Sequence, residues 1–374
     1  MKESIKKLLR ENILNEIDWD TKFYDVSKKG MSYDETKKYL LTIIDNCSKK
    51  PADREKLALD KPYIHNKRIP TFQDGDIDLE SFIKNIITPP KKILSANAKM
   101  EKSSDENSIS VNIGIPALRG LVYDIDNKLF YIVNTCPGAG SCALICYARR
   151  GSYVLFPDVF VNQTRVLNLL LNYPDKFERL LKMELESFAI KNPDKEIQMR
   201  WNDAGDFFTD TYFQIASKIT KDLVSEGYNI KSYAYTKMGK LINLSDTNLT
   251  LNFSDDANKK QTGMVKDLPN AKKSVIVPKE LFYDLLIRDD KNKHFATNEK
   301  GKVIFKDGLS GLEELKNRLA KNYNVTPSSI ITYDELLRTP KNTGKIYNVI
   351  VMPKGDGDTG AQRDDVKISF LLYH

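Results

Sequence analysis

Apolar residues recur every three or four positions in three segments near the middle of the chain. This spacing places them on one face of a helix, so it predicts amphipathic helices over residues 157–171, 174–190 and 209–227. In the last segment, Thr209 has the side chain of a helix N-cap, and Gly227 stands where the helix is expected to stop.

Short segments rich in β-branched and aromatic residues lie between these helices. We expect a hairpin that turns at Asp126 and Asn127, over residues 120–135, and strands over 108–114, 196–203, 229–237, 248–255, 272–279 and 345–354. Strands that alternate with helices are typical of βαβ units, which build a parallel sheet. The pattern therefore predicts an α/β fold, and an open doubly wound sheet and a barrel both fit it.

Residues 1–110 carry helical patterns and a polar connector instead of alternating strands and helices. Ser32 and Glu35 have the spacing of a capping box ahead of a helix. Residues 89–108 are polar and indicate a connector. We therefore expect a mainly helical N-terminal accessory region, followed by an α/β domain over 111–374.

Chemically capable side chains gather where the predicted strands end. Stretches of this kind are 134–150, 202–208, 235–237, 252–256, 278–279 and 352–358. By contrast, a loop that leads from a helix to the next strand, such as 191–196, holds ordinary solvated residues. The carboxyl ends of parallel strands meet at one rim, where α/β proteins place their ligands. This asymmetry predicts a ligand-binding or catalytic protein.

The first of these stretches holds three of the four cysteines of the chain. Cys136, Cys142 and Cys146 have the spacing C-x5-C-x3-C, and Gly138 and Gly140 let the loop curl so that the sulfurs can converge. Thiolates suit zinc or an iron–sulfur cluster. The chain has only three histidines, His65, His294 and His374, so a Cys2His2 finger at this loop is excluded.

Three interpretations of the cysteine loop remain open. A distant residue completes a closed structural zinc site, or a cluster keeps an open position that a small molecule fills. In the third, some of the thiols are only small buried hydrophobic groups, and Cys146, beside Ile145 and Tyr147, fits that role best.

Composition narrows the classes of protein that fit. The 374 residues are 41% hydrophobic and 10% aromatic, as in an ordinary globular protein, and the net charge of +7 permits a nucleic-acid partner without demonstrating one. No apolar stretch is long enough to span a membrane. The start of the chain, with Ile5, Leu8 and Ile13 at helical spacing, predicts an amphipathic helix and no secretory signal. We therefore expect a cytoplasmic protein with no membrane partner.

Three stretches carry a resemblance to a known family. CPGAGSCALICYAR, RWNDAGDFFTDTYF and SYAYTK occur in this order and together resemble the phage Gene product 88 family, over roughly residues 110–374. No established activity accompanies that family. The resemblance implies a phage protein that acts in the cytoplasm of the host cell.

The same stretches are similar in pattern to radical SAM enzymes. That resemblance implies a partial (β/α)6 barrel, with a [4Fe–4S] cluster on Cys136, Cys142 and Cys146 and S-adenosylmethionine on its fourth iron. It also implies that the cofactor is bound by Asp203, Gly205, Asp206, Tyr235 and Lys237. Two features depart from the pattern. The usual cysteine spacing is C-x3-C-x2-C, and the usual Gly-Gly-Glu run reads Ala-Gly-Asp at residues 204–206.

Further polar residues at the rim are candidate substrate ligands. These are Arg149, Lys279, Lys354, Asp356, Asp358 and Arg363. The cationic side chains could bind a phosphate or a carboxylate, and the carboxylates could bind a cation. Each also has an ordinary alternative, as a surface side chain or part of a solvated turn. Arg200 and Trp201 are adjacent on a predicted strand, so their side chains face opposite sides and one of them lines the site.

Two functions fit these observations. The first is an iron–sulfur, radical-SAM-like enzyme that acts on a small or nucleotide-like substrate. The second is a non-catalytic, zinc-stabilised protein that binds nucleic acid, because the basic balance and the aromatic strand ends are compatible with base stacking. A cysteine nucleophile is disfavoured, since no histidine lies in the strand-end stretches to act as a base.

Overall fold

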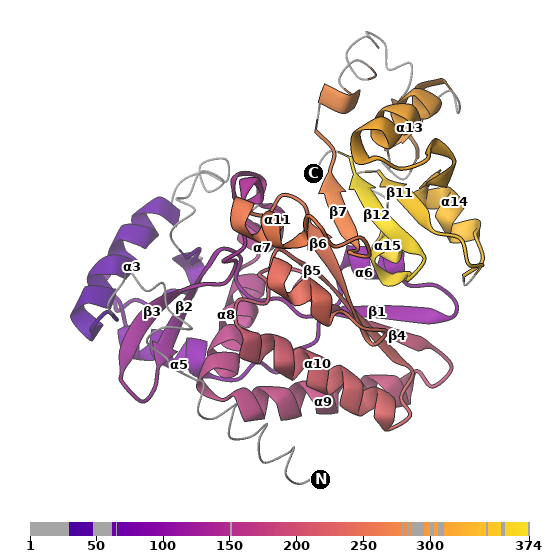
Figure 1. The fold of residues 1–374 in the computed structure, drawn as a ribbon. Helices are drawn as coiled ribbons and strands as arrows, with labels where there is room; N and C mark the ends of the chain where they lie inside the picture. Colours follow the sequence, from indigo (N-terminus) through magenta and orange to yellow (C-terminus); the bar gives the residue numbers. More distant parts are fainter. Residues whose placement is uncertain are drawn as a thin grey trace. The chain divides into compact units, whose positions relative to one another are not determined.

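The computed structural model describes residues 30–47, 62–64, 66–149, 152–278, 280–282, 285, 295–299, 303–305, 310–341, 343–352 and 356–372. The chain forms two compact units (Figure 1). Unit 1 comprises Met1–Leu94, Ile113–Lys191 and Asn202–Tyr228, and unit 2 comprises Ser95–Asn112, Asn192–Trp201 and Asn229–His374. The segments of the two units alternate along the chain. The expected division into an accessory region up to residue 110 and an α/β domain from residue 111 stays a prediction.

Unit 1 contains a β-hairpin and the longest helices. The hairpin strands, β2 (Arg119–Asp124) and β3 (Leu129–Asn134), pair antiparallel, as predicted. The helices and 3-10 turns are α3 (Tyr33–Cys47), η1 (Asn66–Arg68), α5 (Leu79–Ile87), η2 (Ser141–Ile145), η3 (Tyr147–Arg149), α7 (Ser152–Leu155), α8 (Pro157–Asn172), α9 (Pro174–Lys191) and α10 (Asp210–Ser225).

The ends of the unit 1 helices follow the signals in the sequence. The Ser32 amide donates to Glu35 Oε2 at 2.7 Å, so the predicted capping box is present ahead of α3. Thr209 caps α10, since its hydroxyl accepts from the Tyr212 amide at 3.1 Å. Gly227 follows α10 with a φ of +90°, a conformation that favours glycine. The amphipathic helix expected around Ile5 lies outside the described residues.

The core of unit 1 forms where the hairpin meets α5 and α8 (Figure 1). Leu121, Phe130 and Ile132 of the hairpin are buried in one cluster with aromatic and aliphatic side chains of these helices, among them Phe82, Ile86, Phe160 and Val161. Burial of apolar surface on this scale is the main stabilising contribution to such a unit.

Unit 2 is built on an eight-stranded sheet in which every pair of neighbouring strands is parallel. In sheet order the strands are β1 (Ser108–Asn112), β4 (Glu196–Trp201), β5 (Ile230–Thr236), β6 (Leu249–Ser254), β7 (Lys273–Ile276), β12 (Val366–Leu371), β11 (Tyr347–Val351) and β10 (Ile330–Thr332). The mixed α/β fold with a parallel sheet is therefore confirmed. The first five strands follow chain order, whereas the last three run in reverse, unlike the continuous order of a (β/α)6 barrel.

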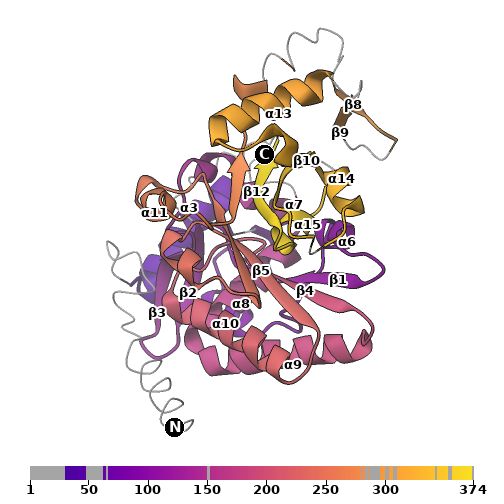
Figure 2. The same cartoon turned by 45° about the vertical axis from the view of Figure 1, so that its right-hand side comes forward.

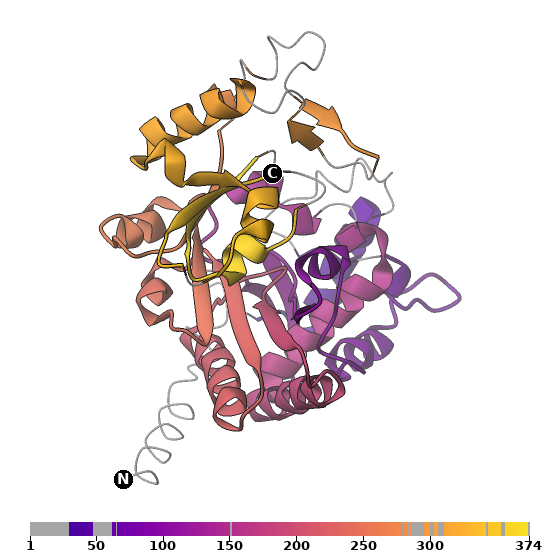
Figure 3. The same ribbon diagram turned by 90° about the vertical axis from the view of Figure 1, so that its right-hand side faces the viewer.

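Helices and turns of unit 2 pack on this sheet. They are α6 (Ala98–Ser103), η4 (Gly239–Leu244), α11 (Lys259–Val265), α13 (Ser310–Tyr323), η5 (Pro327–Ser329), α14 (Tyr333–Arg338) and α15 (Thr359–Gln362), beside the small hairpin of β8 (Phe295–Thr297) and β9 (Val303–Phe305). Val349 and Ile350 are neighbours in β11, so their side chains point to opposite faces of the sheet. Ile350 packs with α13 and Val349 packs with α14, so the two helices cover different faces (Figure 2). Figure 3 shows these C-terminal elements in orange and yellow.

The two faces of the sheet differ in polarity. One face carries apolar side chains, among them Ile197, Met199, Trp201, Leu251 and Phe253. The register aligns polar side chains on the other, which we call the polar face: Ser110, Asn112, Gln198, Arg200, Tyr233, Tyr235, Thr250, Asn252, Ser254, Ser274 and Ser369. All of these except Tyr235 are buried. Buried parallel strands are ordinarily apolar on both sides, so this face is exceptional.

Within the described residues, no helix is both long and apolar enough to cross a membrane.

Candidate functional site

The cysteine loop lies in unit 1, directly after β3. Cys142 is part of η2, Cys136 precedes that turn and Cys146 follows it, and all three side chains are half-buried. The Leu118 amide donates to Cys136 Sγ at 3.3 Å, and Leu118 holds a φ of +65°, which is uncommon for a branched residue. In chain order the loop belongs to the connection between β1 and β4, the first two strands of the parallel sheet.

The turn over residues 202–206 contacts the cysteine loop within unit 1. The Asp206 amide donates to the Thr135 carbonyl at 3.0 Å, and the Tyr147 hydroxyl donates to the Asp203 carbonyl. Cys146 packs against a small buried cluster of alanines, Ala117, Ala148 and Ala204. The structure therefore brings together two of the motifs that the sequence singled out.

The backbone of this turn is strained and closely packed. Asn202 has a φ of +56° and Gly205 a φ of +79°. A Cβ atom on Gly205 would lie 2.3 Å from Ile115 Cγ1, and one on Gly114 would lie 2.2 Å from Asp203 Oδ1. Strain of this kind is concentrated at functional sites, and Gly114 lets the backbone come close to the Asp203 carboxylate.

The turn is acidic and largely removed from water. Asp203 and Asp206 are buried, and the Tyr153 hydroxyl donates to Asp203 Oδ2 at 3.0 Å. Burial, and then the charges of Asp206 and Asp203, raise the pKa of Tyr212 far above its usual value. The Tyr212 hydroxyl donates to Asn202 Oδ1 at 2.7 Å, while the buried Asn202 Nδ2 has no hydrogen-bond partner. Such a turn offers acceptors to a cation and one donor to a ligand.

The residues of the loop fit a thiolate-bound metal in their chemistry. Three soft thiol ligands lie within one short loop, and the three histidines of the chain lie outside the described residues. In the described part of the chain, no three His, Cys, Asp or Glu side chains lie in a group that could hold a metal ion.

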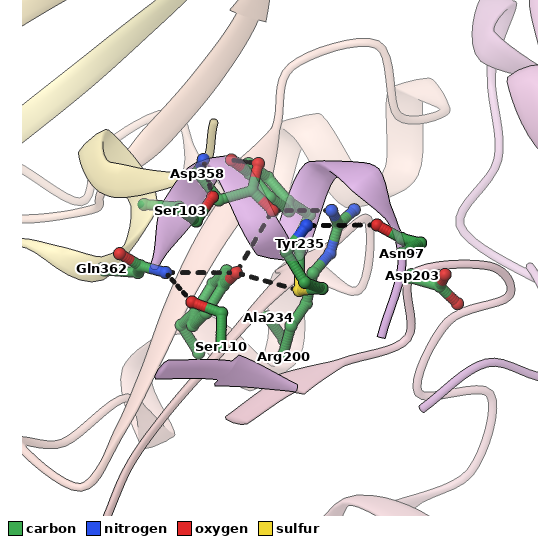
Figure 4. Close-up of polar contacts among 12 residues, drawn as sticks. Asn97, Ser103, Ser110, Arg200, Asp203, Ala234, Tyr235, Asp358 and Gln362 are labelled. Carbon is green, nitrogen blue, oxygen red and sulfur yellow. Dashed lines mark hydrogen bonds and ion pairs between the residues drawn. The ribbon is translucent and has the colours of Figure 1, made fainter. Parts of the chain in front are cut away.

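A second polar cluster lies on the polar face of unit 2 (Figure 4). Arg200 Nη1 and Asp358 Oδ2 form a buried ion pair at 2.6 Å. The hydroxyls of Tyr233 and Tyr235 donate to the same carboxylate at 3.2 and 3.1 Å. The Asp358 amide donates to Ser103 Oγ at 2.6 Å. Burial and the Asp358 charge raise the pKa of both tyrosines well above the usual value, so their hydroxyls remain donors.

The predicted cofactor ligands thus fall into two groups. Asp203, Gly205 and Asp206 belong to the unit 1 turn, whereas Tyr235 and Lys237 belong to unit 2. Lys237 pairs with Asp256 at 3.5 Å, and Tyr235 binds Asp358.

The predicted substrate ligands have separate environments. Arg149 is buried in unit 1 and lies 5.9 Å from the Tyr63 ring centroid. Asp356 Oδ2 accepts from the Met352 amide at 2.7 Å. Arg363 uses all five of its N–H donors within the chain, on Asp365 and on three carbonyls at the end of α14. Lys279 and Lys354 lie outside the described residues.

Sequence reasoning missed several residues on the polar face or in contact with its polar cluster. Ser103 lies in the predicted connector, residues 89–108, and Ser110 lies just after it. In the structure this stretch holds α6 and leads into β1. Alternation of polar residues within the predicted strands, as in SISVN and NFS, was the available signal. Lys272 was also missed, and burial lowers its pKa to about 7 while it donates to the Ala361 and Arg363 carbonyls.

Comparison with known proteins gives one family. The family model described as Gene product 88 matches residues 91–312, more than half of the chain, and the match includes the cysteine loop, the 202–206 turn and β5. No curated protein and no solved structure matches the chain. The chain therefore belongs to the Gene product 88 family of phage proteins.

Proposed function

We propose that this protein is a radical-SAM-like enzyme in which Cys136, Cys142 and Cys146 hold a [4Fe–4S] cluster. The carrying observation is the contact between the cysteine loop and the 202–206 turn in unit 1. The loop belongs to the connection between the first two parallel strands, and the turn directly follows the second. This is the order that the resemblance to radical SAM enzymes implies.

The residues of the turn would bind the cofactor beside the loop. S-adenosylmethionine carries an ammonium group, for which the carboxylates of Asp203 and Asp206 are acceptors, while Asn202 Nδ2 is a donor for a carboxylate. Gly114 lets the backbone pack against the Asp203 carboxylate and Gly205 lets it pack against Ile115, so both glycines help to hold the turn in place. A bound cluster and sulfonium cofactor would supply one-electron chemistry, and these residues bind and orient the cofactor.

The proposed substrate is a small or nucleotide-like molecule, handled in the cytoplasm of the host cell. The first five strands of the unit 2 sheet follow chain order, as the wall of a partial barrel would. The buried polar face supports an interior that binds a polar substrate, since buried polar side chains require hydrogen-bond partners.

Anaerobic purification followed by metal and sulfide analysis tests the proposal. We expect a brown protein that contains iron and sulfide, and loss of most of the iron in Cys142→Ala, because the three thiolates act as one ligand set. Cys47→Ala is the matched control, since this cysteine is remote from the loop in sequence, and we expect it to keep its iron.

Two results would contradict the proposal. A colourless protein with one tightly held zinc would favour the zinc-stabilised, nucleic-acid-binding alternative, which would be supported by DNA or RNA binding that weakens steeply with salt. Iron content that is unchanged in Cys142→Ala would show that the three cysteines do not share one site.

A further inference from the structure

We propose that the polar face of the unit 2 sheet is a binding site for a small molecule with an oxyanion group, a carboxylate or a phosphate. In the structure, the carboxylate of Asp358 occupies the position that this group would take. Arg200, Tyr233 and Tyr235 are the residues that would bind it.

Three donors from two neighbouring strands converge on the Asp358 carboxylate. Arg200 Nη1 lies 2.6 Å from Oδ2, the Tyr233 hydroxyl donates to Oδ2 at 3.2 Å and the Tyr235 hydroxyl to Oδ1 at 3.1 Å. Arg200 is further fixed by the Tyr235 ring, whose centroid lies 5.1 Å from its Cζ (Figure 4). A guanidinium with two hydroxyls is a preorganised site for an oxyanion, whichever molecule carries that group.

The position of the cluster favours a ligand site over a purely structural ion pair. Arg200 and Tyr235 are each the residue before the last in their strands, β4 and β5. Open α/β sheets bind ligands at the carboxyl ends of their strands, and these two side chains lie near those ends of two neighbouring strands. A buried ion pair adds little net stability compared with apolar packing, so stability alone does not explain this one.

The polar face also offers hydrogen bonds that the described residues leave unused. Four of its side chains, each at least nine-tenths buried, have a polar atom without a hydrogen-bond partner: Asn112 Nδ2, Gln198 Oε1, Asn252 Oδ1 and Ser274 Oγ. Buried polar atoms are nearly always satisfied in native proteins. We therefore expect these four atoms to be available to other polar groups of the small molecule that carries the oxyanion.

Asp358 lies in a short segment, residues 356–363, that covers the polar face. Gln362 Nε2 donates to Ser110 Oγ at 3.2 Å, and Asn252 Nδ2 donates to the Ala361 carbonyl at 3.2 Å. A Cβ atom on Gly357 would lie 2.4 Å from Ser103 Oγ, so the segment packs tightly where Asp358 enters the cluster. A ligand oxyanion would replace one side chain of this segment and keep the three donors satisfied.

Ligand-dependent stability of the full-length protein tests this site. We expect inorganic phosphate, malonate or a nucleoside 5′-monophosphate to raise the melting temperature of the wild type saturably, above the effect of chloride at equal ionic strength. Asp358→Ala should bind the same probe about tenfold more tightly, since the internal competitor is gone. The more effective of phosphate and malonate identifies the class of oxyanion.

Matched variants separate this site from general anion effects. Asp364→Ala removes a carboxylate from the next turn of chain, where Asp364 pairs with Lys231 at an exposed position, and should bind as the wild type does. Arg200→Leu should abolish the saturable shift. Asp358→Asn keeps the size of the side chain and serves if Asp358→Ala does not fold.

Two outcomes would overturn the site. One is a wild type that responds to the oxyanions no more than to chloride, which would make Asp358 a structural residue only. The other is binding that survives Arg200→Leu. Binding at Arg200 does not require metal at the cysteine loop, so metal analysis of the same preparations distinguishes failure of this site from failure of the proposed iron–sulfur function.

Discussion

Gly205 occupies a position in unit 1 where two constraints act on one residue. Its φ of +79° lies in the region that favours glycine, and a Cβ atom there would lie 2.3 Å from Ile115 Cγ1. We expect Gly205→Ala to lower the free energy of unfolding by about 3 kcal/mol, because backbone strain and overpacking add. Urea unfolding followed by circular dichroism measures this change.

Gly227 provides the control for Gly205. Its φ of +90° is similar, but nothing lies within 4 Å of the Cβ position. Gly227→Ala should therefore cost only about 1 kcal/mol, from the backbone term alone. Equal losses in the two variants would show that the contact with Ile115 does not constrain the turn.

Lys272 gives the stability of the protein a specific pH dependence. Burial lowers its pKa to about 7 in the folded chain, against a usual value of 10.5. Between these two values the unfolded chain binds the extra proton, so the free energy of unfolding should rise with pH, by at most about 1.4 kcal/mol per pH unit. Below about pH 7 both states are protonated, so the slope disappears and the destabilisation by the buried ammonium group stays constant at its full value.

Thermal unfolding of wild type and Lys272→Met between about pH 7 and 9 tests this dependence. The difference in stability between the two proteins should change with pH, because the methionine side chain does not titrate. Lys273→Met, at the next position in the chain, is the control and should keep the slope of the wild type. A parallel pH response in wild type and Lys272→Met would contradict the lowered pKa.

At the scale of elements, the sequence predicted the helices and helix ends that are determined by local residue patterns. The apolar stripes located α8, α9 and α10 to within one or two residues, and Thr209 and Gly227 located the ends of α10. The short helix α6 was not predicted because its residues, AKMEKS, carry little apolar periodicity. Its place is determined by tertiary contacts with β1 and by Ser103, which binds the distant Asp358.

The candidate sites were predictable to different degrees. The cysteine loop and the 202–206 turn were visible as motifs, because unusual residues cluster within each. The polar face was not, because its members are single polar residues on six strands, and only the pairing register brings them to one face. Arg200 and Trp201 were expected to face opposite sides, and the structure confirms this.

At the scale of the whole molecule, strand order determines which fragments can fold. β12 lies between β7 and β11, although it is the last strand described in the chain. The segment that matches the family model, residues 91–312, lacks β10, β11 and β12. Without them β7 becomes an exposed edge, and Val275 and Phe282 lose their buried partners Phe370 and Leu372.

We therefore expect a fragment of residues 1–312, which keeps α3 and α5 of the unit 1 core and lacks β10, β11 and β12, to be insoluble or to lack a cooperative thermal transition. The full-length chain, expressed in parallel, is the control and should unfold cooperatively. A soluble fragment with a sharp transition would contradict the role of the C-terminal strands in completing the sheet.

Trp201 gives the molecule a built-in optical reporter. Its indole is fully buried on the apolar face of β4, one residue after Arg200 on the polar face, and the chain has only one other tryptophan. Trp201 is the next residue of the same strand, so a ligand that replaces Asp358 and shifts Arg200 should also alter the surroundings of the indole. With Trp19→Phe as background, the emission of a single residue would report events on the opposite face of the sheet without any added dye.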